Sequence, residues 1–182
     1  SFLLSGIPPV GPSTLKIDES RIYYGELTGA ADTYAIVKTR IPEFDRPSSD
    51  NAETQLLTTT YTGRGVPIGD ALHKLLLSTY LGESKILLSS DITGGSEILY
   101  RRNIMDRIRT VAPFLAYDSD PYLAIADGRL VWIIDAYTTT DRYPYSQPFA
   151  GTSKITGAGP FNYLRNSVKV TVDAYDGGVK LF

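Results

Sequence analysis

Apolar residues recur at helical spacing along two stretches in the middle of the chain. The first stretch begins at Pro67, a residue suited to the first turn of a helix, and ends at Gly82, a residue suited to a helix C-terminus. The spacing predicts a helix between these two residues. The residues that share one face of this helix are Ile68, Leu72, Leu75, Leu76 and Thr79.

The second stretch predicts a helix that starts near Ser96, where Glu97 would lie at the positive end of the helix dipole. Pro113 should end this helix, because proline lacks a backbone N–H and disfavours helical geometry in the residue before it. Residues 85–89 lie between the two stretches and fit either a buried strand or part of a helix. The apolar face of the second helix consists of Ile104, Ile108, Val111 and Leu115.

Alternating residues and tight turns predict two β-hairpins in the C-terminal half. In the first, residues 122–126 meet residues 129–134 across Asp127-Gly128, a pair that tolerates the positive φ of a two-residue turn. In the second, residues 167–175 meet residues 179–182 across a glycine-rich turn. Alternation places Val168, Val170, Val172 and Ala174 on one face of its first strand, and Lys169, Thr171, Asp173 and Tyr175 on the other.

Less regular patterns cover the rest of the chain. Residues 1–20 contain three prolines and are expected to form an extended N-terminal segment. We predict an α+β fold with a mainly antiparallel sheet, two principal helices and two C-terminal β-hairpins, in a single domain over residues 1–182. Further strands are predicted at residues 21–27, 33–39 and 55–61, with a polar connector at 41–53 and a long ordered loop at 138–164.

Composition narrows the range of functions. The 182 residues carry a net charge of −2, and without an excess of basic residues we expect no nucleic-acid partner. The chain has no cysteine and one histidine, His73, which excludes thiol catalysis, cysteine-bound zinc and a site of several histidines. The run Leu130–Ile134 is the longest apolar run of the second half and is too short to span a bilayer. We therefore expect this piece to be soluble, and its start at Ser1 indicates a domain excised from something longer.

Ordered landmarks along residues 21–182 resemble uncharacterised protein family 0182, a family of large bacterial and cyanobacterial multi-pass membrane proteins. The resemblance implies that this chain is a soluble region outside the cytoplasm, whose partner is the transmembrane part of its own full-length chain. It implies no catalytic residue, because the family has no established activity. The main landmarks are Tyr23-Tyr24-Gly25-Glu26, Pro42-Glu43-Phe44-Asp45, Gly65-Val66-Pro67, Arg101-Arg102-Asn103-Ile104, Ala112-Pro113-Phe114-Leu115, Tyr117-Asp118-Ser119-Asp120-Pro121-Tyr122, Asp127-Gly128-Arg129-Leu130, Arg142-Tyr143-Pro144-Tyr145-Ser146 and Asn162-Tyr163-Leu164-Arg165-Asn166-Ser167.

The segment around Tyr117 is the first candidate binding site. Asp118 and Asp120 place two carboxylates two residues apart, and hard oxygen ligands of this kind could hold Ca²⁺. A calcium loop needs a third ligand, a glycine and a final glutamate, which this segment lacks. The sequence therefore favours turn hydrogen bonds from these aspartates to nearby backbone N–H groups, and we predict no metal and no cofactor.

The tyrosine-rich loop is the second candidate. Arg142, Tyr143 and Tyr145 combine charge with flat aromatic rings, which is the kind of surface that a sugar or peptide of the cell envelope could stack against. The alternative is that these rings are buried and fix a long loop in place.

Catalysis has weaker support. Glycoside cleavage needs two carboxylates about 5–10 Å apart across a cleft, as acid and base. The candidates for these roles are Glu26, Glu43, Asp45, Asp135 and Asp173, but the sequence does not supply that geometry. His73 has no evident nucleophile beside it. The residues thus favour a non-catalytic structural or binding role, with no catalytic residue assigned. The alternative is an envelope hydrolase of a carbohydrate or peptide polymer that uses Asp118, Asp120, Asp135 and Asp141 near the tyrosine-rich loop.

Overall fold

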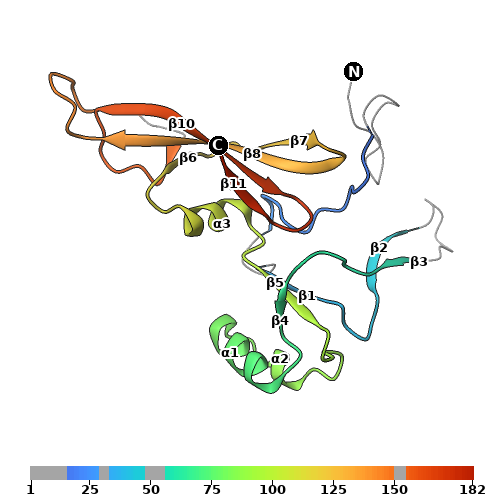
Figure 1. Cartoon of the computed structure of the whole chain (residues 1–182). Coiled ribbons are helices and arrows are strands. Elements are labelled where there is room, and N and C mark those ends of the chain that lie inside the picture. Colours follow the sequence, from blue (N-terminus) through green and yellow to red (C-terminus); the bar gives the residue numbers. More distant parts are fainter. Residues whose placement is uncertain (1–15, 29–32, 48–55, 150–154) are drawn as a thin grey trace. The chain divides into compact units, whose positions relative to one another are not determined.

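The computed structural model describes residues 16–28, 33–47, 56–149 and 155–182, which form two compact units (Figure 1). The larger unit joins Ser1–Ala31 to Arg101–Phe182, and the smaller unit is Asp32–Tyr100. Antiparallel sheets with short helices confirm the predicted α+β class. The expectation of one domain over 1–182 stays a prediction, and most of the expected extended segment, 1–20, lies outside the described residues. Within the described part of the chain, no helix is long and apolar enough to cross a membrane.

The larger unit is built on an antiparallel sheet. Its long strands β8 (Arg129–Thr140) and β10 (Tyr163–Asp173) pair along most of their length, with a register shift between Asn166 and Val168. The remaining strands, in the order β11-β10-β8-β6-β9 with β7 also on β8, are β11 (Val179–Leu181), β6 (Ala116–Asp118), β9 (Ile155–Thr156) and β7 (Tyr122–Ala126). The predicted loop over 138–164 is therefore shorter, because β8 and β10 both extend into it and β9 lies within it.

Both predicted hairpins are confirmed. Strands β7 and β8 meet across Asp127 and Gly128, whose φ angles of 50° and 75° are those of a two-residue turn. Strands β10 and β11 meet across a longer turn that contains Gly177, at φ 70°. A Cβ atom at Gly177 would lie 2.6 Å from the ring of Tyr24, so both the backbone angle and the neighbouring ring require glycine there.

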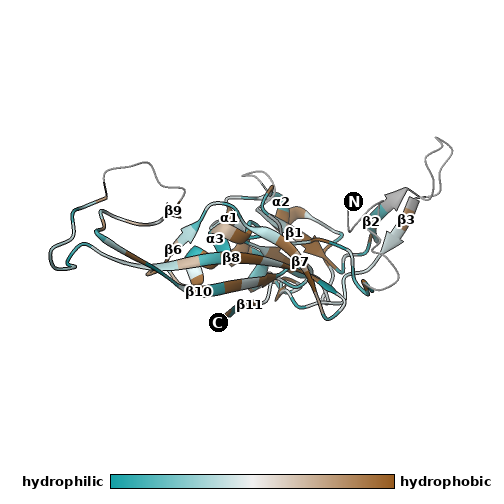
Figure 2. Ribbon diagram, turned by 90° about the horizontal axis from the view of Figure 1, so that it is seen from above, coloured by the Kyte–Doolittle hydropathy of each residue, from teal (hydrophilic) through white to brown (hydrophobic). Residues whose placement is uncertain are grey.

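Alternation along the two long strands separates an inner face from an outer face, visible as bands of colour in Figure 2. The inner face is buried and carries Leu130, Ile134, Ala136, Val170 and Val172. Helix α3 (Ile104–Val111) adds Ile104 and Ile108 to the buried residues of this unit.

Helix α3 starts eight residues later than the predicted start near Ser96. Residues 97–100 form strand β5 (Glu97–Tyr100), and Asn103 caps the helix by accepting from the backbone N–H groups of Met105 and Asp106. The helix ends before Pro113, as predicted. Leu115 lies beyond its end, and Val111 is exposed, so the predicted apolar face is buried only in its first half.

The smaller unit has a three-stranded sheet, β1-β5-β4, with strands β1 (Tyr34–Val37) and β4 (Val66–Pro67) on either side of β5. The unit also contains helices α1 (Ala71–Leu81) and α2 (Lys85–Leu88). Residues 85–89, whose sequence fits either a strand or a helix, are therefore mostly helical. Its core cluster consists of Ile68, Ile86, Ile92 and Ile98, with Tyr34, Ile36, Val66, Leu77 and Leu81 packed against them.

Two predictions in this half of the sequence are wrong. Residues 41–53 were expected to be a polar connector, but strand β2 (Glu43–Pro47) pairs there with β3 (Leu56–Thr59), which confirms the strand expected at 55–61. Residues 21–27 form no strand, and Gly25 makes only an isolated bridge to Asn103. Residues 48–53 of the expected connector lie outside the described residues. The bridge between Gly25 and Asn103 joins segments that are distant in sequence, so a local pattern does not reveal it.

Helix α1 has the predicted spacing but begins at Ala71, because Asp70 accepts from the backbone N–H of His73 as N-cap, while Pro67 belongs to β4. Gly82 ends it in the left-handed conformation, as predicted, at φ 72°. The side of the helix that packs inward carries Leu77, Ser78 and Leu81. Of the predicted apolar face, Ile68 precedes the helix and is buried, whereas Leu72, Leu75 and Leu76 lie on the opposite side and point outward.

Candidate functional site

The outer face of the larger sheet gathers the polar side chains of the long strands. Residues that alternate with the buried ones, such as Arg129 and Asp135 of β8 and Lys169 and Asp173 of β10, share this face because side chains of a strand point to opposite sides in turn. Strand β11 adds Lys180, which lies opposite Thr171. The candidate site is therefore a surface built by register, with residues from both predicted hairpins.

Part of this face is hollowed to a volume of about 440 Å³, which we call the outer hollow. Every residue that lines it belongs to the larger unit. The lining mixes cationic, acidic and apolar side chains: Ala126, Asp127, Arg129, Val131, Thr171, Asp173, Asp176, Gly178, Lys180 and Phe182.

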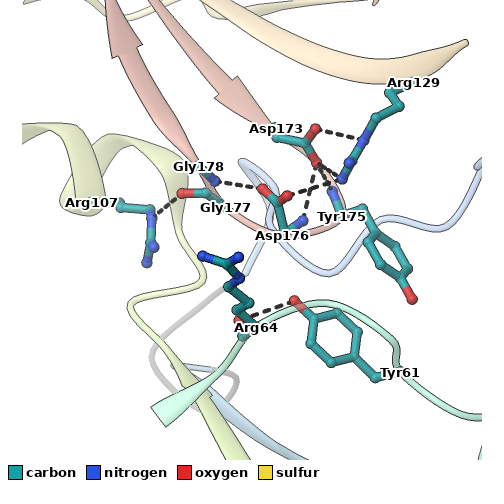
Figure 3. A network of polar contacts seen from close by, with 9 residues as sticks. All are labelled: Tyr61, Arg64, Arg107, Arg129, Asp173, Tyr175, Asp176, Gly177 and Gly178. Atoms are coloured by element: carbon teal, nitrogen blue, oxygen red, sulfur yellow. Dashed lines mark hydrogen bonds and ion pairs between the residues drawn. The ribbon is translucent and has the colours of Figure 1, made fainter. Parts of the chain in front are cut away.

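Two aspartates of the β10–β11 turn hold Arg129 in place (Figure 3). Its Nη2 donates to Asp173 Oδ1 at 2.8 Å and to Asp176 Oδ2 at 3.2 Å. Its Nε lies 2.8 Å from Asp173 Oδ2 as an ion pair, although its N–H is not aligned on that oxygen as a hydrogen bond. Burial lowers the pKa of Arg129, but the charges of Asp173 and Asp176 outweigh that effect and raise it.

The turn itself is fixed from several sides. Asp173 Oδ1 accepts from the backbone N–H groups of Tyr175 and Asp176, and Asp176 Oδ1 accepts from that of Gly178 at 2.8 Å. Arg107 of α3 donates from Nε to the carbonyl of Gly177 at 2.7 Å. Arg129 of β8 is therefore preorganised by contacts with a braced turn.

A second polar group lies farther along the outer face. Asp135 pairs with Lys169 and accepts from Asn166 Nδ2 at 3.0 Å, and the hydrogen bond from Lys169 holds the pKa of Asp135 below its usual value. Tyr137 donates to Asp118 Oδ2 at 3.3 Å. Burial raises the pKa of Tyr137, and the negative charge of Asp118 adds to that shift.

The predicted residues of the first candidate segment have structural partners. Tyr117 is buried, and its hydroxyl lies 2.7 Å from the carbonyl oxygen of Ala112 at the end of α3. Asp118 Oδ1 accepts from the backbone N–H of Asp120 at 3.1 Å, which is the turn hydrogen bond that the sequence favoured. Among the residues that the structure describes, no three His, Cys, Asp or Glu side chains are placed to hold a metal ion.

The tyrosine-rich loop is only partly pinned down. Tyr143 stacks on Tyr163 with ring centroids 4.8 Å apart, and its backbone exchanges two hydrogen bonds with the side chain of Asn162. Arg142 is exposed, 3.8 Å from Asp141, and Tyr145 is fully exposed at a positive φ of 61°. Tyr143 contacts the rest of the loop but is still 52% exposed, so its ring is not buried, and the ring of Tyr145 is open to solvent.

The four carboxylates of the hydrolase hypothesis do not gather around the outer hollow. Asp118 and Asp135 belong to the second polar group, Asp120 is an exposed turn residue, and Asp141 lies on the tyrosine-rich loop. None of the four lines the hollow. His73 is also accounted for, because it is exposed and pairs with the cap residue Asp70.

Of the residues that line the hollow, only Asp173 was a candidate from the sequence, as a possible acid or base. Asp127 was seen only as a turn residue, Asp173 as one of several carboxylates, and Arg129, Lys180 and Phe182 only as parts of strands. The alternation along residues 167–175 was the available signal, because it already placed Thr171 and Asp173 on one face. Joining them to Arg129 and Lys180 required the pairing of three strands.

The comparisons with known proteins identify relatives without a described activity. The model of an uncharacterised protein family, UPF0182, matches residues 1–182. Curated proteins named UPF0182 protein are similar over the whole chain: 48% identical in Geobacter sp. (strain M21), 50% in Pelobacter propionicus and 44% in Clostridium acetobutylicum. This chain spans only 18–19% of the length of these relatives. No solved structure matches it.

Proposed function

The chain belongs to the uncharacterised protein family UPF0182, and on that premise we propose that it is a non-catalytic docking domain of a multi-pass membrane protein. It lies on the extracytoplasmic side and packs against another part of its own full-length chain. The resemblance described above supports the location. The relatives are about five times as long as this chain, so the rest of a protein of that length is available as the partner.

The observation that carries the proposal is the outward face of α1. Leu72, Leu75 and Leu76 are 62%, 53% and 58% exposed, and Tyr80 beside them is 59% exposed. The same helix turns Ser78 inward. Leu77 and Leu81 of the helix pack against the core, but Leu72, Leu75 and Leu76 do not. A helix with this second, exposed group of leucines is arranged for a contact beyond the smaller unit's own core.

Burying these side chains would be strongly favourable. Each leucine fully removed from water contributes about 1.5–3 kcal/mol, so a partner that covers three of them gains a substantial part of the free energy of a stable contact. Contiguous exposed apolar surface of this kind marks interaction sites on soluble domains. The outward face of α1 is therefore the surface on which we place the partner.

The charges around α1 favour a protein partner over a lipid surface. Helices that lie on membranes carry several Lys or Arg residues beside their apolar face. Helix α1 has one lysine, Lys74, and its ammonium group lies 3.4 Å from the carbonyl oxygen of Ile92. The residues that flank the helix, Asp70 and Glu83, are acidic. The expected partner is thus an apolar face of the remaining four fifths of the full-length protein.

Thiol labelling of the full-length protein in its native membrane tests both parts of the proposal. This region contains no cysteine, so Leu76→Cys introduces a single reporter there, and Leu27→Cys is the matched control, because Leu27 is 95% exposed and far from α1 in sequence. A membrane-impermeant maleimide is added to cells whose outer envelope has been permeabilised. Mass spectrometry of the peptide that contains the new thiol measures the extent of labelling.

We expect rapid labelling of Leu27→Cys in these cells, whose inner membrane is intact, and strong protection of Leu76→Cys, with equal labelling of both in denaturant. Equal labelling of both variants in the native membrane would contradict docking. Labelling of Leu27→Cys only after the inner membrane is opened would contradict the extracytoplasmic location.

A further inference from the structure

The outer hollow contains polar groups that the fold does not use. Among the described residues, the Lys180 ammonium, the Asp127 carboxylate and the Thr171 hydroxyl make no side-chain hydrogen bond or ion pair. They come from β11, the β7–β8 turn and β10, so the hollow is bordered by open donors and acceptors on three different elements.

Arg129, which also lines the hollow, contributes further donors. Its Nη2 is used by Asp173 and Asp176, whereas its Nη1 makes no hydrogen bond with the described residues. Because two carboxylates already fix the guanidinium, a ligand that accepts from Nη1 does not need to order this side chain. Hydrogen bonds from a charged donor of this kind are also stronger than neutral ones.

The hollow has an apolar side as well. Phe182 is 73% exposed, and Val131 and Ala126 also line the surface. An exposed aromatic ring beside open polar groups offers a flat apolar surface to one side of a ligand while the polar groups bind the other. The ligand must therefore be amphipathic on a small scale.

The balance of charge argues against an ionic ligand. Two cationic residues, Arg129 and Lys180, oppose the carboxylates of Asp127, Asp173 and Asp176, so a ligand of either sign meets groups of its own charge. A hydroxyl group, in contrast, is one donor and two acceptors, and can bond to both kinds of group. A ring with several adjacent hydroxyls and an apolar C–H face satisfies every wall of the hollow.

We propose that the outer hollow is a binding site for a neutral carbohydrate unit of one or two rings. Its hydroxyls accept from Lys180 and Arg129 and donate to Asp127, and its C–H face lies on Phe182. The volume of about 440 Å³ lies within the range of small-ligand sites. This site differs from the tyrosine-rich loop, and it does not depend on the docking proposed for α1.

Amide NMR spectra of the 182-residue chain, titrated with cellobiose, maltose and N,N′-diacetylchitobiose, test the proposal. Sodium acetate, methylammonium and glycine serve as anionic, cationic and zwitterionic controls. We expect at least one disaccharide at millimolar concentration to shift the amide signals of Asp127, Gly178 and Lys180, and we expect none of the ionic compounds to do so. Shifts caused by glycine or acetate but by no sugar, or by none of the probes, would overturn the proposal.

Variants on exposed side chains assign the binding without disturbing the braced turn. Lys180→Ala removes a charged donor, and Phe182→Ala removes the stacking surface. Each substitution should therefore weaken sugar binding by about tenfold or more. Lys169→Ala is the matched control, because Lys169 is on the same face and pairs with Asp135 outside the hollow. Sugar binding that survives both substitutions would place the ligand elsewhere and contradict the inference.

Discussion

Helices α1 and α3 carry apolar residues at similar spacing and bury them to opposite degrees. In α3, Ile104 and Ile108 are 0% and 1% exposed. In α1, Leu72 and Leu76, also four residues apart, are more than half exposed. The first half of the apolar face of α3 is buried within its own unit, whereas α1 exposes the face that carries Leu72 and Leu76.

The surroundings of the two helices explain the difference. Helix α3 begins at Asn103, whose side chain also donates to the carbonyl of Glu26, and Tyr117 of the sheet contacts the carbonyl of Ala112 at its other end. Helix α1 is capped at both ends by Asp70 and Gly82, residues of its own connections. The two caps fix where α1 begins and ends. Its packing in the smaller unit uses the side of Leu77 and Leu81, opposite Leu72 and Leu76. The spacing of apolar residues therefore shows which face of a helix can be buried. Whether that face is buried depends on the element that packs against it.

The largest expected effect contrasts the two faces directly. Ile108→Ala should destabilise the larger unit by about 2–5 kcal/mol because it leaves a cavity in the core, whereas Leu76→Ala should change stability by less than about 0.5 kcal/mol. Urea unfolding followed by the fluorescence of Trp132, the only tryptophan, reports the larger unit, and far-UV circular dichroism reports both units. Equal costs for the two substitutions would show that the face of α1 is already covered in this chain.

The second prediction makes the same contrast within α1. Leu81→Ala removes contacts with the isoleucine cluster and should cost about 1–3 kcal/mol in the smaller unit, while Leu72→Ala should be nearly neutral. Amide hydrogen exchange at Ile86 and Ile98, which are buried in that cluster, measures the stability of this unit. If Leu72→Ala costs as much as Leu81→Ala, the assignment of inner and outer sides is reversed.

The third prediction concerns the start of α3. Asn103→Ala removes the N-cap and two further hydrogen bonds from Nδ2 to the carbonyls of Glu26 and Thr28, and should cost about 1–2 kcal/mol. Asn103→Asp keeps the cap oxygen and loses the donor, so its cost should be smaller. Thermal unfolding of the two variants provides the measurement. An equal loss for both would assign the whole effect to Nδ2 and none to the cap.

The smallest effect is a difference in pH dependence between the two caps. The backbone N–H and side chain of His73 lower the pKa of Asp70, so its contribution is present above the unfolded pKa and lost as the pH falls through the lowered value. Helix α1 should therefore lose support below about pH 4, whereas the Asn103 cap of α3 has no charge to titrate. Amide exchange at Lys74 and Arg107 between pH 2 and 6 compares the two first turns. Asp70→Asn should remove the dependence at α1, and a dependence that persists in this variant would contradict its assignment to Asp70.

Local signals in the sequence predicted the elements that local chemistry controls. Asp127-Gly128 forms its turn, Gly82 ends α1 and Pro113 lies just beyond α3, because each depends on the backbone preferences of the residues themselves. Ser96 and Glu97 had the features of a helix start, but they are held by distant partners. Ser96 donates to the carbonyl of Lys38, and Glu97 pairs with the Lys38 ammonium at 2.9 Å and becomes part of a strand.

The candidate site also depends on contacts between residues that are distant in sequence, and these could not be predicted. Sequence singled out residues clustered along the chain, such as Asp118 with Asp120 and Tyr143 with Tyr145, because only neighbours in sequence can be grouped by inspection. The outer hollow draws Asp127, Thr171 and Lys180 together through the register of β8, β10 and β11. Such a site depends on which strands pair and in what register. The turns could be predicted from the sequence, but the register between β8, β10 and β11 could not.

The smaller unit is one uninterrupted run of the chain, and the larger unit consists of the two runs on either side of it. Pairing of Tyr34 with Tyr100 closes the smaller unit on itself. The backbone N–H groups of Tyr23 and Tyr24, in contrast, both donate to the carbonyl of Ala174, near the end of the sequence. As the ribosome synthesises this protein, the β1–β5 pairing of the inserted unit can form once Tyr100 is free of the exit tunnel. Tyr23 and Tyr24 are made before the inserted unit and their partner Ala174 is made after it, so the inserted unit can fold before the larger unit is complete.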